Sequence, residues 1–115
     1  MKSKISLAFQ KCREEKRPAL LTYTVAGDNN KKKSIEIINS ISEFADIIEL
    51  GFPHNTPIAD GGQIQESSQR ALKAGIKLKD VFQIVSNFRR SNKTKPVILM
   101  GYYNIVYQFG EDKFL

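Results

Sequence analysis

The sequence predicts an α/β fold in which short strands alternate with helices along the chain. Three observations support this: three short apolar runs rich in β-branched or aromatic residues, helical apolar periodicity between them, and the spacing of βα units. Such units place parallel strands side by side under helices, so three of them form a sector of a barrel or a small open sheet. A closed barrel of eight units needs about 250 residues, and this chain has 115. We therefore expect residues 1–115 to form a single incomplete domain.

The first part of the chain predicts a helix followed by a buried strand. Apolar side chains recur at helical spacing over residues 3–16, at Ile5, Ala8, Phe9 and Cys12. Pro18 ends this helix, and residues 19–25 have the β-branched and aromatic composition of a buried strand. A turn follows at residues 27–30, where Asn30 is placed to cap the next helix.

The middle of the chain predicts a second helix and a second strand. The helix covers residues 31–45, with apolar side chains along one face. Residues 46–50 form a short strand. The long loop after this strand contains two prolines and a glycine pair, which are typical of irregular backbone.

The last part of the chain predicts two helices, a third strand and the start of a further helix. The first helical pattern covers residues 64–74, and Gly75 suits the left-handed position that often follows a helix. The second covers residues 78–91, with an apolar face made of Val81, Ile84, Val85 and Phe88. Residues 96–100 form the third strand, and residues 110–112 open a further helix.

The composition predicts a reduced, cytoplasmic protein. Hydrophobic residues make up 41% of the chain and charged residues 26%, as in an ordinary globular domain. No apolar run approaches the ~20 residues of a membrane-spanning helix, and the first residues lack the apolar block of a signal peptide. The single cysteine, Cys12, allows neither an internal disulfide nor a multi-thiolate metal site. We expect no metal and no membrane contact.

The net charge of +6 raises the question of an anionic partner such as nucleic acid. The cationic residues are scattered, with one cluster at residues 31–33 and another between residues 89 and 95. Both clusters fall at predicted helix ends, and no aromatic residues are interleaved as stacking platforms for bases. We interpret them as solvated helix ends and expect no nucleic-acid partner.

Candidate functional side chains follow the strands, because parallel α/β proteins gather such groups at the carboxyl ends of strands. Glu49 ends the second strand between apolar residues, where a carboxylate is costly unless it is paired or protonated. Burial favours the protonated form of a carboxyl group, which suits a residue that both gives and takes a proton. A glutamate tied to a backbone amide or a lysine is the structural alternative.

Other polar residues near the strand ends have strong structural explanations. Asp60 precedes two glycines, as in ordinary turns and helix caps. His54, the only histidine, lies in a loop, where such residues are commonly exposed and idle. Tyr102 and Tyr103 follow the third strand, where aromatic residues often serve in packing. None of these residues alone identifies a function.

Taken together and in order, these segments resemble the tryptophan synthase alpha chain family. The most specific segment is residues 45–53 (ADIIELGFP), continued by residues 57–61 (PIADG). Residues 23–28 (YTVAGD) and residues 100–104 (MGYYN) also match in order and spacing. The resemblance spans almost the whole chain. It implies a partial (β/α)8 TIM barrel, made of the first three βα units and an N-terminal helix.

The resemblance also implies a reaction, the retro-aldol cleavage of indole-3-glycerol phosphate to indole and glyceraldehyde 3-phosphate in tryptophan biosynthesis. It assigns Glu49 to proton transfer at the substrate hydroxyl and at indole C3, and Asp60 to the indole N–H. One desolvated carboxyl group and one ionised group suit this division of work. Tyr23, Met100 and Tyr102 match positions that line the indole pocket of the family.

The family resemblance implies a partner as well. In the family a beta chain receives the indole within an alpha2beta2 assembly, and pyridoxal phosphate belongs to that beta chain, so no cofactor is expected in this chain. The matching positions that face the beta chain are Pro53, Thr56 and Asn104. The family usually has Phe-Ser-Asp where this chain has His54-Asn55-Thr56, so an acidic residue of the partner-facing loop is replaced.

Two further departures lie nearby, because the family usually has Pro-Thr at residues 62–63 and commonly has Pro at Asn29. The family's phosphate-binding loops come from the second half of the barrel. Because binding energy from remote groups aligns the reacting centre, we expect little lyase activity from residues 1–115 alone. The alternative interpretation is a non-catalytic truncated barrel fragment that folds or assembles without activity.

Overall fold

The centre of the molecule is a parallel sheet. The computed structural model describes residues 2–55 and 59–115 of the chain. Within these residues the sheet has three strands in the order β1-β2-β3, which are β1 (Leu21–Val25), β2 (Ile47–Gly51) and β3 (Val97–Met100). Tyr23 on β1 pairs with Glu49 on β2, and Glu49 pairs with Ile98 on β3. Their side chains therefore lie on one face of the sheet.

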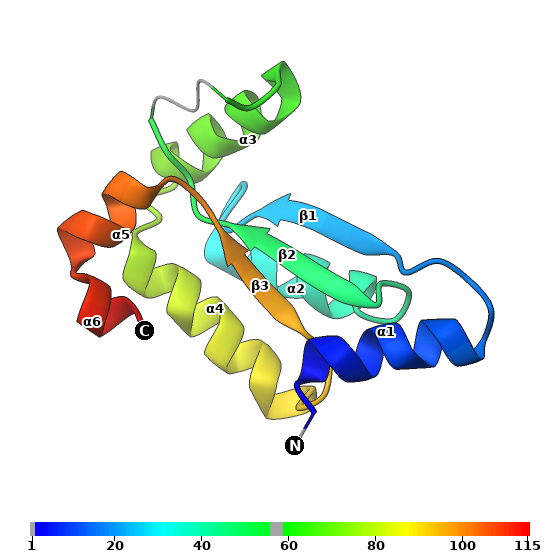
Figure 1. Ribbon diagram of the computed structural model, residues 1–115. Coiled ribbons are helices and arrows are strands. Elements are labelled where there is room, and N and C mark those ends of the chain that lie inside the picture. Colours follow the sequence, from blue (N-terminus) through cyan, green and yellow to red (C-terminus); the bar gives the residue numbers. More distant parts are fainter. Residues whose placement is uncertain (1, 56–58) are drawn as a thin grey trace.

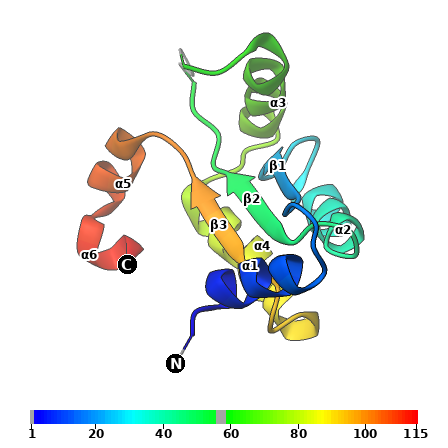
Figure 2. The same cartoon turned by 45° about the vertical axis from the view of Figure 1, so that its right-hand side comes forward.

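The helices surround this sheet on several sides. Figure 1 shows α2 (Lys31–Ile41) and α4 (Leu78–Ser91) behind the strands, and α1 (Lys4–Glu14) across their amino-terminal ends. In the same view α3 (Gly62–Lys73) stands beyond the carboxyl ends. Two short helices, α5 (Tyr103–Phe109) and α6 (Glu111–Phe114), lie beside β3 on the side away from β1 (Figure 2). Strands and helices thus alternate as the sequence predicts.

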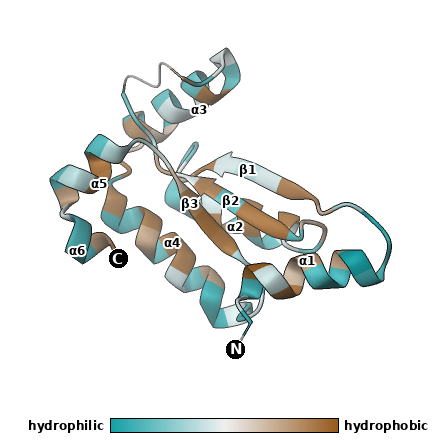
Figure 3. Ribbon diagram, in the orientation of Figure 1, coloured by the Kyte–Doolittle hydropathy of each residue, from teal (hydrophilic) through white to brown (hydrophobic). Residues whose placement is uncertain are grey.

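The main core lies between the sheet and the two helices behind it. Ile48 and Leu50 of β2 are fully buried and belong to one cluster with residues of α2 and α4, which are Ile38, Val81, Ile84 and Phe88. Figure 3 shows how strongly hydrophobic residues are concentrated in β2 and β3. Since side chains alternate along a strand, Glu49 and Gly51 point to the face opposite Ile48 and Leu50. The core therefore fixes which face of β2 carries Glu49.

Two predicted features of the helix ends are confirmed. The Asn30 side chain accepts a hydrogen bond from the Lys33 N–H and caps α2. Gly75 follows α3 with φ of +82°, the left-handed conformation that glycine adopts most readily. Ser3 caps α1 in the same manner as Asn30 caps α2, because its hydroxyl oxygen accepts from the Ser6 N–H.

Several element boundaries differ from the predicted ones. The helix predicted over residues 31–45 ends at Ile41, and Phe44, which the pattern places on its buried face, is 76% exposed. Ala45 is buried, but as part of the entry to β2 rather than of the helix. The apolar pattern therefore runs across a helix end into the next strand. The glycine pair also differs, because Gly62 opens α3 instead of belonging to the loop.

Helix α5 is not predicted from the sequence. It has only seven residues, too few for helical periodicity to be recognised, and none of them is fully buried. Its position depends on tertiary contacts with α4, where the Phe82 ring lies 5.5 Å from the Phe109 ring and 5.7 Å from the Phe114 ring of α6. Tertiary packing rather than local periodicity therefore forms this helix.

An ion pair ties the segment after α1 to the start of β2. The Arg17 guanidinium donates to both carboxylate oxygens of Asp46, at 2.8 and 2.9 Å, and the Leu20 N–H donates to the same carboxylate at 2.7 Å. The hydrogen bonds from Arg17, followed by the bond from the Leu20 N–H, hold the pKa of Asp46 well below its usual range. The charged form of Asp46 is therefore favoured by the fold.

This ion pair predicts a loss of stability in acid. Because the pKa of Asp46 is lower in the folded chain than in the unfolded chain, its contribution is present above the unfolded value of about 4 and is lost as the pH falls below it. Urea denaturation at a series of pH values should show the free energy of unfolding decreasing over this range. The decrease should be shallower in Asp46→Asn, which is also less stable at neutral pH.

The matched control for this titration is Asp112→Asn, since Asp112 is exposed on α6. This variant should retain the full acid-dependent decrease of the parent chain. Equal slopes for Asp46→Asn and the parent chain would contradict the role given to the Arg17–Asp46 pair.

Candidate active site

A cavity of about 360 Å³ opens at the carboxyl ends of the three strands. Its walls come from all three strand ends, from the β2–α3 loop and from α3. The residues that the sequence predicts to be catalytic or to line an indole pocket are all in this wall, namely Tyr23, Glu49, Asp60, Met100 and Tyr102. The volume lies at the lower end of the ~300–1,000 Å³ range of small-molecule sites.

Glu49 lies on the middle strand of the sheet. It is flanked by Tyr23 on β1 and Ile98 on β3, while its neighbours Ile48 and Leu50 are turned into the core. The sequence predicts that Glu49 is buried, and this is only partly correct, because the structure leaves Glu49 half-buried. The reason is that the face carrying Glu49 is the one that the cavity opens onto, whereas the helices cover the other face.

Asp60 reaches the same cavity from the loop before α3. The Tyr102 hydroxyl donates to Asp60 Oδ2 at 3.4 Å and accepts from the Ala59 N–H at 3.0 Å. The Asp60 carbonyl accepts from Gln65 Nε2 at 2.8 Å. Asp60 does not cap the helix, since the N-cap position of α3 is Gly61. Its carboxylate is therefore directed by Tyr102 rather than used in a helix cap.

Tyr23 forms the wall of the cavity on the β1 side. A Cβ atom added to Gly51 would lie 2.0 Å from the Tyr23 hydroxyl oxygen, so the ring passes directly over the glycine. Burial raises the pKa of Tyr23, and the negative charge of Asp60 raises it further, with smaller contributions from Tyr102 and Glu49. Gly51 is thus required for Tyr23 to occupy the cavity wall, and the Tyr23 hydroxyl stays protonated there.

Substituting Gly51 with alanine should therefore disturb the cavity. The added methyl group overlaps the Tyr23 ring, so the ring must move, at a cost of about 1–3 kcal/mol in the free energy of unfolding. Displacement from its buried position should also return the pKa of Tyr23 toward the ordinary value, which a spectrophotometric titration of the tyrosines measures.

Gly62→Ala is the matched control, because a Cβ at Gly62 meets no atom within 4 Å. This control should leave the stability and the tyrosine titration nearly unchanged. If Gly51→Ala and Gly62→Ala gave the same tyrosine titration, Gly51 would not determine the position of Tyr23.

Helix α3 is held in place by Asp28, a residue that the sequence does not single out. Arg70 donates to both Asp28 carboxylate oxygens, at 2.7 and 2.9 Å, and the Ser67 hydroxyl donates to one of them at 2.5 Å. Asp28 lies in the turn after β1, and the family-like segment 23–28 includes it, but neither feature predicts its bonds to α3. These bonds fix α3, and with it the loop that carries Asp60, above the end of β1.

Comparison with known proteins identifies the family of the chain. A family model described as tryptophan synthase alpha chain matches residues 9–115. The chain belongs to the tryptophan synthase alpha chain family. This confirms the resemblance carried by the segments around Glu49 and Asp60. It also confirms the fold class, because the three βα units with their preceding helix are part of a TIM barrel.

Relatives in this family are close in sequence and structure. The tryptophan synthase alpha chain of Pelagibacter ubique (strain HTCC1062) is 69% identical over 113 residues, covering 98% of this chain and 43% of the relative. The crystal structure of tryptophan synthase subunit alpha from Legionella pneumophila str. Paris has a TM-score of 0.95 at 34% identity, covering 99% of this chain and 44% of that chain. A mutant alpha-subunit from Pyrococcus furiosus has a TM-score of 0.80 at 47% identity, covering 84% and 39%. The chain thus spans less than half of each relative.

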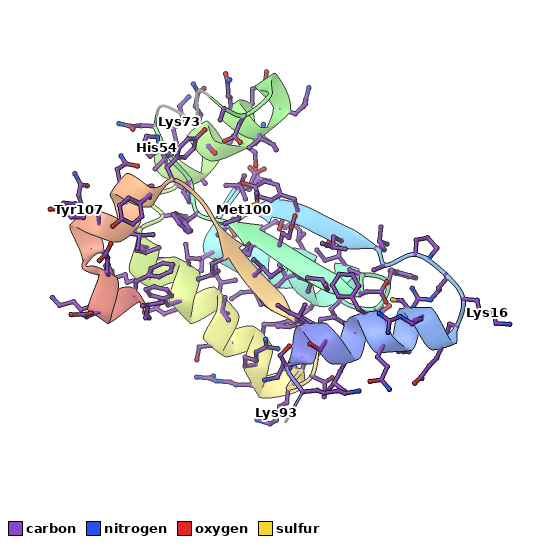
Figure 4. All side chains as sticks on the ribbon, viewed as in Figure 1. Lys16, His54, Lys73, Lys93, Met100 and Tyr107 are labelled. Carbon is purple, nitrogen blue, oxygen red and sulfur yellow. The ribbon has the colours of Figure 1, made fainter. Side chains whose placement is uncertain are left out.

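His54, where the alpha-chain family usually has phenylalanine, does not have the exposed position expected for it. It is half-buried and lines the cavity. Its ring lies 4.8 Å from the Tyr102 ring, and its Nε2 lies 3.1 Å from Asn104 Nδ2 on α5. Figure 4 labels His54 and Met100, which both lie on the carboxyl-end side of the sheet. Sequence reasoning misses these contacts because they join residues about fifty positions apart.

Two of the residues expected to face a beta chain, Pro53 and Asn104, lie close to the contact between His54 and Asn104. Pro53 is half-buried in the segment after β2, and Asn104 is exposed in the first turn of α5. Thr56 lies outside the described residues. The contact between His54 and Asn104 nevertheless brings the segment after β2 next to α5, so Pro53 and Asn104 belong to neighbouring parts of one surface.

The remaining expectations from the sequence concern metal binding, membrane-spanning helices and the distribution of positive charge. Within residues 2–55 and 59–115, no group of three or more His, Cys, Asp or Glu side chains is arranged to hold a metal ion. None of the helices described is long and apolar enough to cross a membrane. Figure 4 labels three lysines, Lys16, Lys73 and Lys93, which lie far apart from one another in that view.

Proposed function

We propose that this chain contributes the catalytic carboxylates of a tryptophan synthase alpha-chain lyase, which cleaves indole-3-glycerol phosphate to indole and glyceraldehyde 3-phosphate. The observation that carries the proposal is that Glu49, from a strand, and Asp60, from a separate loop, line one cavity together with Tyr23, Met100 and Tyr102. Membership of the alpha-chain family supports it.

The reaction is a retro-aldol cleavage that needs one proton added and one removed. Protonation of indole C3 gives an indolenine cation, which can accept the electron pair of the bond to the glycerol chain. Removal of the hydroxyl proton turns the neighbouring carbon into the aldehyde as that carbon–carbon bond breaks, and the electron pair restores the indole ring. Glu49 is half-buried beside apolar neighbours and opens onto the cavity, which suits transfer of both protons.

Asp60 has a different task, because positive charge develops on the indole nitrogen after C3 is protonated. A carboxylate that accepts the indole N–H stabilises this charge. The hydrogen bond from the Tyr102 hydroxyl holds the orientation of Asp60. The Tyr23 ring and the Met100 side chain, which is 51% exposed, provide apolar surface for the flat indole ring.

A beta chain of tryptophan synthase is the partner that we propose, within an alpha2beta2 assembly. Pro53 and Asn104 lie in neighbouring segments that also carry the cavity-lining residues His54 and Tyr102, where a partner receiving indole would bind. In this proposal pyridoxal phosphate belongs to the beta chain. The proposed chemistry of this chain uses side chains alone.

Titration of the 115-residue chain with indole and with indole-propanol phosphate tests the proposal. The chain has two methionines, Met1 and Met100, so a methyl-labelled sample gives a simple NMR spectrum in which Met100 reports on the cavity. Met100→Leu assigns the signal. We expect a saturable shift of the Met100 methyl signal with either ligand, and no such shift with glycerol phosphate at the same concentration.

A Met100 signal that stays unchanged at saturating indole would contradict the proposed site and favour the non-catalytic fragment. Salt-dependent binding of unrelated oligonucleotides would instead favour a nucleic-acid function.

A further inference from the structure

Three side chains from two segments of the chain meet beside the cavity, and we call them the His54–Tyr102–Asn104 cluster. His54 belongs to the segment after β2, whereas Tyr102 and Asn104 lie at the start of α5. The His54 and Tyr102 rings are 4.8 Å apart, with an angle of 39° between their planes. His54 Nε2 lies 3.1 Å from Asn104 Nδ2. Because an amide nitrogen only donates, Nε2 is the acceptor of this bond.

The cluster is connected to Asp60 through one atom, the Tyr102 hydroxyl oxygen. This oxygen accepts from the Ala59 N–H at 3.0 Å and carries the proton that is donated to Asp60 at 3.4 Å. The second distance is near the upper limit for a hydrogen bond, so a small displacement of the Tyr102 ring would break it. The position of the ring therefore decides whether Asp60 is held.

Two contacts of His54 determine where that ring lies. The tilted ring contact fixes the ring face of Tyr102, and the bond to Asn104 fixes His54 relative to the first turn of α5. A phenylalanine, the usual residue of the family at this position, would keep a ring contact and lack the bond. His54 thus adds a directional contact that an apolar ring does not supply.

We propose that His54 is a positioning residue for Asp60, which it orients through Tyr102 and Asn104. This inference rests on the proposed function, in which Asp60 binds the indole N–H. The contact of His54 with the Tyr102 ring, and the bond of the Tyr102 hydroxyl to Asp60, give the route by which His54 acts on Asp60.

The test compares His54→Phe, His54→Ala and Asn104→Ala with the parent chain by NMR. Two signals are followed, the exchange rate of the Ala59 amide proton with water and the carboxyl-carbon shift of Asp60. Loss of the hydrogen bond to Ala59 should raise its exchange rate by about two- to tenfold in His54→Ala. His54→Phe should give a smaller increase, and the Asp60 carboxyl signal should move in both variants.

The double variant His54→Phe/Asn104→Ala separates the bond from general packing. If His54 acts through Asn104, the double variant should resemble His54→Phe alone, because both single changes remove the same bond. His54→Phe retains an aromatic ring of similar size, so it gives the decisive readout if His54→Ala fails to fold. Exposed Gln108 on α5 provides a control, and Gln108→Ala should leave both signals unchanged.

Unchanged Ala59 exchange and an unchanged Asp60 signal in His54→Phe would overturn the inference, and so would strictly additive effects of the two single changes. These results do not depend on ligand. Failure of the parent chain to bind indole at Met100 would count against the proposed function alone, so the two failures are distinguishable.

Discussion

Substituting Glu49 with glutamine should lower the rate of indole-3-glycerol phosphate cleavage by about 10²–10⁴-fold in an active form of this chain. Glutamine keeps the shape of the side chain and cannot move protons. Because Glu49 is asked to serve at both the hydroxyl and indole C3, the loss should fall at the upper end of this range. Substrate affinity should change much less, since Tyr23 and Met100, the residues proposed to contact the indole ring, line the same cavity and are unaltered.

Asp60→Asn is the matched comparison and should be less damaging. The asparagine carbonyl can still accept the indole N–H, and the Tyr102 hydroxyl that faces Asp60 Oδ2 can donate to that carbonyl as well. What is lost is the full negative charge that stabilises the indolenine cation. Measurable turnover should therefore remain.

Steady-state cleavage by the two variants measures this difference, and binding of indole-propanol phosphate shows that each variant is folded. The assignment of roles would be reversed if Asp60→Asn were the slower enzyme while both variants bound the analogue.

Phe88→Ala should give the largest loss of stability among single substitutions in the core, about 3–5 kcal/mol in the free energy of unfolding. Phe88 is the largest of the fully buried side chains and lies on α4 within the cluster under the sheet. Removing its ring leaves a cavity that neighbours such as Ile48 and Ile84, themselves fully buried, can fill only in part. Phe88→Leu should give an intermediate loss.

Tyr107→Ala is the control, because Tyr107 is also an aromatic residue on a helix but is 69% exposed. Its substitution should change the stability by about 0.5 kcal/mol or less. Urea denaturation of the variants measures both effects. Losses of similar size for Phe88→Ala and Tyr107→Ala would show that the cluster under the sheet does not dominate the stability.

The elements with strong local signals could be predicted from the sequence. Helix α4 carries a long apolar stripe, and its predicted range, residues 78–91, matches the structure. The cap at Asn30 and the left-handed Gly75 follow from the chemistry of single residues. Helix α5 could not be predicted, since it has only seven residues, none of them buried, and its contacts are with α4 and with His54 after β2.

Some features of the candidate site could likewise be predicted from the sequence, and others could not. Glu49 stands out because a carboxylate at the end of an apolar strand needs an explanation, and the segment through Asp60 matches a known family. The half-buried state of Glu49 and the role of Asp28 depend on which face of the sheet is covered and on α3. The contacts of His54 join residues far apart in the chain, so local sequence patterns contain no signal for them.

The strand order also has a consequence for how the chain folds. Glu49 lies on β2, whose two hydrogen-bonded neighbours are the strands directly before and after it in the chain. These parallel pairings nevertheless join residues far apart in the chain, since Tyr23 pairs with Glu49 and Glu49 pairs with Ile98, and such pairings form slowly because the intervening loops must close first. During synthesis the backbone frame around Glu49 can be complete only once β3 has left the ribosome, so β2 is expected to acquire its full protection from hydrogen exchange no earlier than that.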